Sequence, residues 1–454
     1  MWRIKADGKT KNMNIYKKLD VPENDLEVTM LSEEQKRMFD EITARAIAGR
    51  EWENALDFRM DYNDLEFGAY YLNKSIKPIV KPLKGHDELE NIFEGFRRSG
   101  FSLNGGGGEN VVTISTAGDL MCTEGLENSK DVMYEEVESF LFDSDISFAN
   151  LESTFSDGEV APTVISSEEG PKINLDTPQY RTLTDHSGKK YDVVQLANNH
   201  IIDCGTEGIS RTLEHLKEDN ICQVGLNMDE ADSHRTLIFE KARLKVGWVS
   251  HTALLNNRSL PEDKPWLVNV TYFDPFEDAD LSKITEQIRY CKEEKCDLII
   301  VAMHWGLEYE FYPHPKEREW AQAFADEGAD IIIGQHPHVI QYSEVIHPKY
   351  DPSMEVPVVY SQGNLTSVLS SAATCLTTLV RFSVEPGKEH ARVTGMEILP
   401  VALVKHIMKD ESRVEIKKLT TLLEMKPEFD HEMQSHIDSM ADYADMVLGK
   451  DWRK

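Results

Sequence analysis

The chain has 454 residues, of which 40% are hydrophobic and 28% are charged, so it can bury a large core without disulfides or a structural metal. Its 80 Asp and Glu residues outnumber its 49 Lys and Arg residues, which gives a formal net charge of −31. An acidic surface of this kind repels nucleic-acid backbones and anionic membranes, and it argues against a nucleic-acid partner.

The N-terminus and the cysteines indicate the compartment. Met1–Lys5 lacks the apolar core of a signal peptide, and no apolar run is long enough for a membrane helix. The six cysteines match no Cys-x-x-Cys framework, which is typical of free thiols in a reducing compartment. We therefore expect a cytoplasmic protein without a membrane anchor.

Residues 1–104 are predicted to form a mostly helical N-terminal extension. Ser32 followed by Gln35 is typical of a helix N-terminus, with Ser32 as the N-cap. The apolar face of this helix is expected to comprise Met38, Phe39, Ile42 and Ile47. A second helix is expected over residues 86–96. The four glycines within residues 105–109 predict a linker.

Residues 110–405 are predicted to form one α/β domain, because strand and helix patterns alternate along them. The predicted strands span residues 111–116, 146–149, 192–197, 245–250, 298–303 and 330–333. The predicted helices span residues 133–141, 208–218, 281–295 and 316–327. This alternation favours a largely parallel sheet that is covered by helices.

The pattern changes after Pro357. Further strands, expected to be antiparallel, span residues 358–360, 376–384 and 392–399. Residues 406–454 are predicted to form a helical tail, with two helices between residues 417 and 448 around Pro427.

Polar side chains recur just after the predicted strands, where open α/β sheets carry their chemistry. They comprise Asp119, Glu152, Asn199, His304, His336 and His338. If the sheet is parallel, these residues converge on one of its edges. Taken singly, Asp119 could cap a turn and His304 could be a hydrogen-bonded core residue. Together, oxygen and imidazole ligands suit Mn, Fe or Zn better than Ca or Mg.

These motifs resemble those of the bacterial CapA family, which is named for capsule and poly-γ-glutamate synthesis and is similar in fold to calcineurin-like metallophosphoesterases. The resemblance covers about residues 110–400. The motifs that carry it are Ala117-Gly118-Asp119-Leu120-Met121, Phe148-Ala149-Asn150-Leu151-Glu152, Leu196-Ala197-Asn198-Asn199-His200, His304-Trp305-Gly306-Leu307-Glu308-Tyr309, Gly328-Ala329-Asp330 running to His336-Pro337-His338-Val339, and Tyr360-Ser361-Gln362-Gly363-Asn364.

The resemblance implies a sandwich of two mixed sheets flanked by helices, with the site at the strand ends. Asp119 and His338 would bind a first metal, and Glu152 would bridge to a second. The second metal would be bound by Asn199, His304 and His336. His200 matches the catalytic histidine of the superfamily, and Asp203 would orient it. The residues predicted to contact substrate are Asn150, Glu308 and Asn364.

The first motif departs from that of the wider phosphoesterases, which reads Asp-x-His, because Met121 stands at the position of that histidine here. Methionine is a poor ligand for a hard divalent ion. Glu152 also stands where those enzymes have Asp. The sequence therefore leaves open whether one or two ions bind.

We expect a metal-dependent hydrolase in which metal-activated water attacks a phosphoester, or a γ-glutamyl amide, and His200 acts as general acid. The substrate would be a small molecule or a γ-glutamyl or phosphorylated compound. A second possibility is a non-catalytic accessory or binding subunit in the biosynthesis of poly-γ-glutamate or a related polymer or peptide. The sequence gives no oligomeric state.

Overall fold

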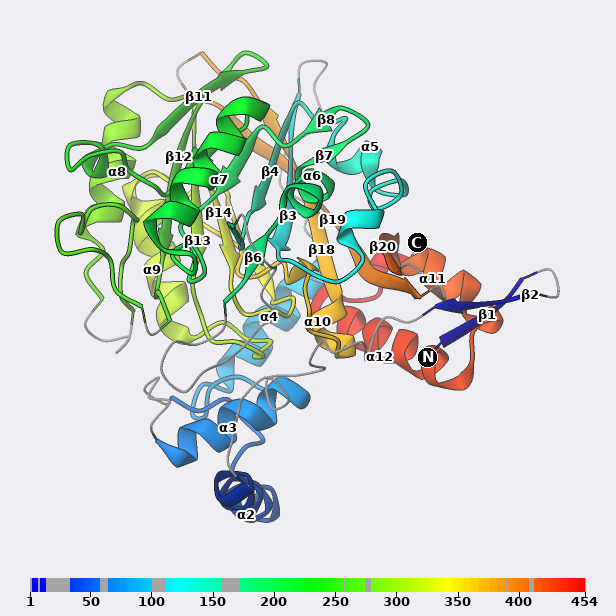
Figure 1. The fold of residues 1–454 in the computed structure, drawn as a ribbon. Helices are drawn as coiled ribbons and strands as arrows, with labels where there is room; N and C mark the ends of the chain where they lie inside the picture. The colour runs from blue at the N-terminus through cyan, green and yellow to red at the C-terminus, as the bar shows by residue number, and fades with distance from the viewer. Residues whose placement is uncertain are drawn as a thin grey trace.

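The computed structural model describes residues 2–6, 9–13, 33–57, 64–99, 111–156, 172–256, 258–273, 279–388, 390–407 and 412–453. Two mixed β-sheets pack face to face at its centre, with helices on their outer sides (Figure 1). The predicted N-cap Ser32 and the glycines of residues 105–109 lie outside the described residues.

The first sheet has the order β1-β2-β19-β18-β3-β4-β9-β10, with β17 beside β3 and β20 beside β19. The neighbours β3, β4, β9 and β10 are parallel, whereas β18 is antiparallel to both β3 and β19. The strands are β1 (Trp2–Ala6), β2 (Lys9–Met13), β3 (Val112–Leu120), β4 (Ile146–Asn150), β9 (Val193–Gln195), β10 (Cys222–Val224), β17 (Asn364–Thr366), β18 (Leu376–Glu385), β19 (Arg392–Ile407) and β20 (Ser412–Lys418).

The second sheet has the order β11-β12-β13-β14-β16-β15, and β12, β13, β14 and β16 are parallel. Its strands are β11 (Leu237–Lys241), β12 (Leu244–Thr252), β13 (Leu298–His304), β14 (Ile331–Gln335), β15 (Ser343–Ile346) and β16 (Val356–Val359). The expectation that residues 358–360 are antiparallel holds for the pairing of β16 with β15 but not for its pairing with β14, which is parallel. Residues 343–346 already return the chain along the edge as β15, so β16 runs in the same direction as β14.

Two short strand pairs lie outside these sheets, β5 (Thr154–Phe155) with β6 (Asn174–Leu175) and β7 (Asp185–His186) with β8 (Lys189–Lys190). The helices are α2 (Glu33–Gly49), α3 (Leu65–Ile76), α4 (Glu88–Ser99), α5 (Glu138–Leu141), α6 (Thr177–Thr184), α7 (Gly205–Asp219), α8 (Ser282–Glu293), α9 (Pro315–Glu327), α10 (Ala372–Cys375), α11 (Leu419–Met425) and α12 (His431–Leu448). Within the described residues, no helix is both long and apolar enough to cross a lipid bilayer.

Successive side chains along a strand point to opposite faces of the sheet, so alternate residues belong to two different hydrophobic cores. In β13, Ile300 points into the space between the sheets, while Ile299 and Val301 pack on the outer side with α8 and α9. Between the sheets, Phe148 of β4 stacks on Trp248 of β12 with ring centroids 4.7 Å apart. Because both faces of these strands are buried, their sequences read as continuous apolar runs.

Helix boundaries follow from local capping signals. The helix α9 begins after His314, which caps it, with Pro315 at its first position and Glu317 completing a capping box. The predicted helix over 133–141 is regular only in α5, from Glu138. Asn220 in the left-handed conformation ends α7.

The N-terminal extension is mostly helical, as expected, although it also contains the unpredicted strands β1 and β2, and one residue of the predicted apolar face is misplaced. Ile47 is 58% exposed, whereas Ala46 is fully buried. Ala46 follows Ile42 by four residues, so it lies on the same face, and Ile47 lies about 100° further around the helix. Further along, Leu89 and Phe93 of α4 join the core that α8 and α9 form on the second sheet.

The C-terminal segment carries one strand that the predicted helical tail lacks. Ser412–Lys418 forms β20, which pairs antiparallel with β19, and the first tail helix therefore begins at Leu419 rather than Lys417. The alternation of buried and half-buried side chains in β20 has period two, which identifies a strand. The domain boundaries at residues 104, 109 and 405 stay predictions.

A buried ion pair joins the extension to the α/β domain. Lys74 Nζ of α3 lies 2.7 Å from Glu310 Oε1, and the two side chains are 3% and 5% exposed. Removing one partner leaves the other charge buried, so we expect Lys74→Met to lower the free energy of unfolding by about 3–5 kcal/mol. Urea unfolding measures this loss.

The matched control for Lys74→Met is the double variant Lys74→Met/Glu310→Leu, which removes both charges. It should recover most of the lost stability, because apolar residues of similar volume often replace a buried pair without cost. A double variant that is less stable than Lys74→Met would contradict this account.

Candidate metal centre

The carboxyl ends of strands from both sheets meet at one place. Asp119 lies at the end of β3, Glu152 follows β4, and Asn199 follows β9 of the first sheet. His304 ends β13 and His336 follows β14 of the second sheet. The expectation of a single sheet edge is therefore wrong in this detail, because the two facing sheets share the site. All eleven residues predicted for the site gather here; they are Asp119, Asn150, Glu152, Asn199, His200, Asp203, His304, Glu308, His336, His338 and Asn364.

Strand register positions the carboxylate of Asp119. Asp119 of β3 pairs with Asn150 of β4 and with Asn364 of β17. The Asn150 amide donates to Asp119 Oδ1 at 2.7 Å and lies 3.2 Å from His304 Nδ1. Asn150 thus joins a residue of the first sheet to one of the second. The predicted contact of Asn150 with substrate stays a prediction.

The backbones of Gly118 and Gly363 lie close together, which places Asn364 beside Asp119. A Cβ atom at Gly118 would lie 1.9 Å from the carbonyl oxygen of Gly363, so a larger residue would push the two loops apart. The Asp119 N–H donates to the same carbonyl at 3.1 Å. Asn364 Oδ1 then lies 2.9 Å from His338 Nδ1.

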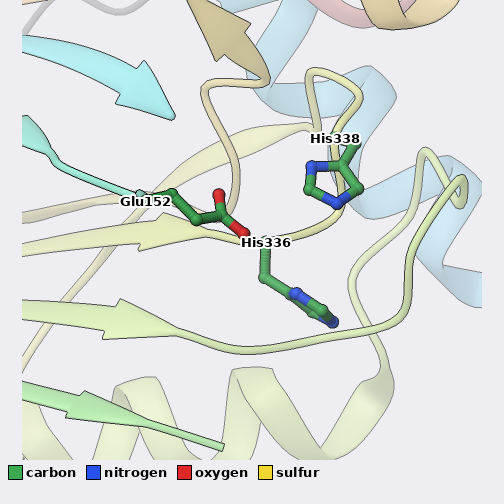
Figure 2. Close-up of side chains that lie close together, drawn as sticks. All are labelled: Glu152, His336 and His338. Atoms are coloured by element: carbon green, nitrogen blue, oxygen red, sulfur yellow. The ribbon is translucent and has the colours of Figure 1, made fainter. Parts of the chain in front are cut away.

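The loop after β14 carries two imidazoles in unusual backbone conformations. His336 has φ 103° and His338 has φ 59°, both in the left-handed region that residues other than glycine seldom adopt. Such strain concentrates at functional sites, where the surroundings hold it in place. Figure 2 shows the side chains of His336 and His338 beside the carboxylate of Glu152.

Two groups of side chains have ligand atoms within 4.8 Å of one another. One group comprises Glu152, His336 and His338, and the other comprises Asp119, Glu152 and His304. Glu152 belongs to both, as a bridging ligand would. The division of the histidines between the groups differs from that implied by the family resemblance.

The environment of Glu152 favours a bound cation. It is fully buried, and within the described part of the chain no donor group bonds to either of its oxygens. Its Oε1 lies 3.5 Å from His304 Nε2 and 4.0 Å from His200 Nε2. Burial, followed by the nearby charge of Asp119, raises the pKa of Glu152 well above its usual value. A divalent ion would reverse this cost by supplying the missing charge.

Two of the three clustered histidines, His304 and His336, are held in the neutral form that suits ligation. Burial and the neighbouring histidines lower the pKa of His304 well below its usual value, and burial lowers that of His336 to about 4. Neutral imidazole is the form that binds metal. For His338, burial also acts to lower the pKa, but contacts with Asp119 and Glu308 outweigh burial and raise it. This favours the charged imidazole, so His338 would release a proton on binding a metal ion. The Asn199 carboxamide oxygen lies 2.9 Å from His304 Nε2, so both face the same space.

His200 and Asp203 form a dyad at the edge of this cluster. His200 Nδ1 lies 2.7 Å from Asp203 Oδ2, which leaves Nε2 facing Glu152. Asp203 is itself fixed, because it accepts a hydrogen bond from the N–H of Ile173 at 2.6 Å and pairs with Arg258 at 2.9 Å. The carboxylate thereby sets which nitrogen of His200 faces the cluster.

Glu308 contacts a histidine of the cluster. Its Oε1 lies 3.2 Å from His338 Nε2, and its side chain is 14% exposed. Burial raises the pKa of Glu308, but its hydrogen bond with His338 and further contacts outweigh burial and lower the pKa to about 2. A carboxylate that holds the outer nitrogen of a ligand histidine fixes the orientation of its ring.

Three residues of the site escaped the sequence analysis. Asn198 donates to Asn150 Oδ1, Asn256 accepts from Asn199, and Arg258 pairs with Asp203. Asn198 stands beside Asn199 in the same motif, so its position was a usable signal. Asn256 and Arg258 belong to a stretch without regular structure, which has no periodicity to reveal them.

A family profile described as "Bacterial capsule synthesis protein PGA_cap" matches residues 113–368, more than half of the chain. The chain belongs to this family. All of the predicted site residues lie within the matched region, whereas the extension and the helices after β20 lie outside it. The resemblance to CapA proteins seen in the sequence is thereby confirmed.

Two of the named relatives are similar over about two thirds of the chain, and a third over about half of it. The capsule biosynthesis protein CapA of Bacillus anthracis is 25% identical over 64% of this chain and 66% of its own length. The PGA biosynthesis protein CapA of Bacillus subtilis is 26% identical over 67% of this chain and 77% of its own length. A probable polyglutamine synthesis accessory protein of Mycobacterium tuberculosis is 26% identical over 49% of this chain and 55% of its own length.

Solved structures give a weaker likeness. A hypothetical protein from Thermus thermophilus has a TM-score of 0.38 at 16% identity and covers 64% of this chain and 99% of its own. A calcineurin-like phosphoesterase from Bacillus subtilis has a TM-score of 0.33 at 11% identity, covering 72% and 99%. Because both TM-scores are below 0.5, the assignment of the fold rests on the two packed sheets and on the family match.

Proposed function

We propose that this protein is a metal-dependent hydrolase that cleaves a phosphoester or a γ-glutamyl amide. One observation carries the proposal: the buried carboxylate of Glu152 lies among imidazoles and, within the described residues, accepts no hydrogen bond. We assign one or two divalent Mn, Fe or Zn ions to this cluster. Their proposed ligands are Asp119, Glu152, Asn199, His304, His336 and His338.

The donor set fits such an ion. Among the described residues, the buried atoms of the cluster that make no hydrogen bond comprise Asp119 Oδ2, both oxygens of Glu152 and His336 Nδ1, which together offer the oxygen and nitrogen ligands that these metals prefer. A bound ion of this kind makes hydroxide available near neutral pH and polarises the scissile group.

Other residues of the site have proposed roles in proton transfer and in positioning the ligands. His200 presents Nε2 toward the cluster while Asp203 holds Nδ1, so His200 is placed to give a proton to the leaving oxygen or nitrogen. Asn150 and Asn364 keep Asp119 and His338 in place through their side-chain contacts.

We place phosphoester hydrolysis slightly ahead of γ-glutamyl amide hydrolysis because the site motifs resemble those of metallophosphoesterases. The relatives are named for capsule and PGA biosynthesis, which supports the γ-glutamyl amide as the alternative substrate class. The substrate, the absence of a nucleic-acid partner and the cytoplasmic location stay predictions.

The test starts from elemental analysis of the protein as isolated, which should show about one or two transition-metal ions per chain. Phosphoester and γ-glutamyl substrates are then offered with that ion restored. Turnover of either class supports hydrolysis. Metal-replete protein that turns over neither class contradicts it.

A second function, as a non-catalytic accessory subunit, is favoured by the name of the Mycobacterium tuberculosis relatives. It predicts no turnover, together with specific binding of a glutamyl polymer or of a partner from its synthesis. Equilibrium binding of poly-γ-glutamate by a His200→Asn variant and by the wild type would then be the same, since His200 would have no role.

Metal removal should also destabilise the protein. Chelation leaves the buried carboxylates of Asp119 and Glu152 without a compensating positive charge. We therefore expect the midpoint of thermal unfolding to fall. Returning Mn²⁺ at about 100 times its dissociation constant should restore about 2.7 kcal/mol. Calorimetry at rising Mn²⁺ concentration measures this, and a midpoint that is independent of Mn²⁺ would contradict it.

A further inference from the structure

The N-terminal extension reaches the candidate metal centre, although it lies outside the region that the family profile matches. The Tyr71 side chain of α3 lies close enough to the Glu308 carboxylate to help lower its pKa. The Tyr71 ring packs edge-on against Tyr309, with centroids 5.8 Å apart, and Tyr309 in turn lies 5.9 Å from the His338 ring. Tyr71 is thus two contacts away from a proposed metal ligand.

The extension is fastened to the loop that carries Glu308. Ile79 forms a parallel bridge with Glu310, in which the Ile79 N–H donates to Tyr309 O at 2.9 Å and the Phe311 N–H donates to Ile79 O at 3.0 Å. Lys74 and the Tyr70 hydroxyl bond to Glu310 at 2.7 and 3.1 Å. These contacts fasten the segment of α3 and Ile79 to the loop that carries Glu308.

The same loop is bonded on its other side to the histidines. The Tyr309 N–H donates to Pro337 O at 2.8 Å, and Pro337 separates His336 from His338. Tyr309 itself has φ 62°, so this loop is held in a strained conformation like those of the two histidines. The loop over residues 307–311 therefore lies between the extension and the ligands.

We propose that Tyr71 is a positioning residue for the metal centre, which holds Glu308 so that Glu308 orients the ring of His338. The extension would then complete a site whose ligands all come from the α/β domain. His338 Nδ1 faces Asp119 Oδ2 at 3.7 Å, and Nε2 faces Glu308, so the two sides of the ring have separate partners. Outer partners of this kind tune the affinity of a ligand histidine for metal.

This inference rests on the proposed function, and Mn²⁺ affinity tests the two separately. Isothermal titration with Mn²⁺ alone is carried out on the full chain and on Tyr71→Phe, Glu308→Gln and the double variant. Glu308→Gln should weaken binding about 10–100-fold. Tyr71→Phe should weaken it about 2–10-fold, the effect of one hydrogen bond. In the double variant the loss should equal that of Glu308→Gln alone, because Tyr71 acts through Glu308.

Tyr70→Phe is the matched control, since it removes a neighbouring hydroxyl that bonds to Glu310 rather than Glu308. It should leave Mn²⁺ affinity unchanged, and urea unfolding of each metal-free variant shows whether the fold is kept. Equal Mn²⁺ affinity of wild type and Tyr71→Phe, or losses that add in the double variant, would overturn the role of Tyr71. A wild-type chain that binds no Mn²⁺, Fe²⁺ or Zn²⁺ would instead overturn the proposed function itself.

Discussion

His304→Ala protein is expected to lose its bound metal and its activity together, and His338→Ala should behave in the same way. His304 is fully buried, and its Nε2 lies 3.5 Å from Glu152 Oε1 and 2.9 Å from Asn199 Oδ1, so truncation removes a donor from the centre of the cluster. We expect metal affinity to fall by more than the roughly 10–100-fold that loss of an outer partner causes. Elemental analysis after dialysis against metal-free buffer measures the loss.

Loss of a buried imidazole can destabilise a protein by itself, so this experiment needs a matched histidine outside the cluster. His251 is fully buried at the end of β12, where it bonds to Gln287 and Thr271. His251→Ala should reduce stability while the metal content stays that of the wild type. If His304→Ala retains the full metal content, the assignment of His304 as a ligand is wrong.

His200→Asn is expected to keep the metal and lose turnover. His200 lies 4.0 Å from Glu152 through Nε2, but its Nδ1 is engaged by Asp203, and it belongs to neither group of close ligand atoms. Loss of a general acid lowers kcat by about 10²–10⁴-fold. Steady-state kinetics on whichever substrate class the wild type cleaves, with metal content measured on the same sample, distinguish the two effects.

The control for this variant is His215→Asn, on the neighbouring helix α7. His215 stacks on Phe155 with centroids 3.9 Å apart and should have wild-type kcat. Asp203→Asn should lower kcat in the same direction as His200→Asn, because the imidazole would lose the group that orients it. Wild-type kcat for His200→Asn on every substrate tested would exclude its role as general acid.

The parallel core of the fold was predictable from local sequence. Strands such as Leu298–His304 and Ile331–Gln335 are buried on both faces, so they appear as short apolar runs that need no knowledge of their partners. The candidate ligands follow these runs directly, which is why the sequence pointed to them. Ile47 was misplaced because it follows Ile42 by five residues, a spacing that turns its side chain away from the face shared by Ile42 and Ala46.

Other parts of the site depend on contacts between residues far apart in the chain. Tyr71 is separated from Glu308 by more than two hundred residues, and nothing in its own segment marks it. Arg258 and Asn256 lie in a stretch without periodicity, so their contacts with Asp203 and Asn199 follow only from the folded chain. The antiparallel β20 and the parallel β16 likewise depend on which strand lies beside them.

The sequence by itself determined the chemical types of the site residues and their places after buried strands, because side-chain chemistry and apolar runs are local properties. Only the tertiary structure decided that two sheets share the site, that Glu152 belongs to both groups of close ligand atoms, and that α3 contacts the loop of Glu308. The physical reason is that packing and long-range pairing are set by the whole folded chain, and they bring together residues whose local sequences carry no sign of one another.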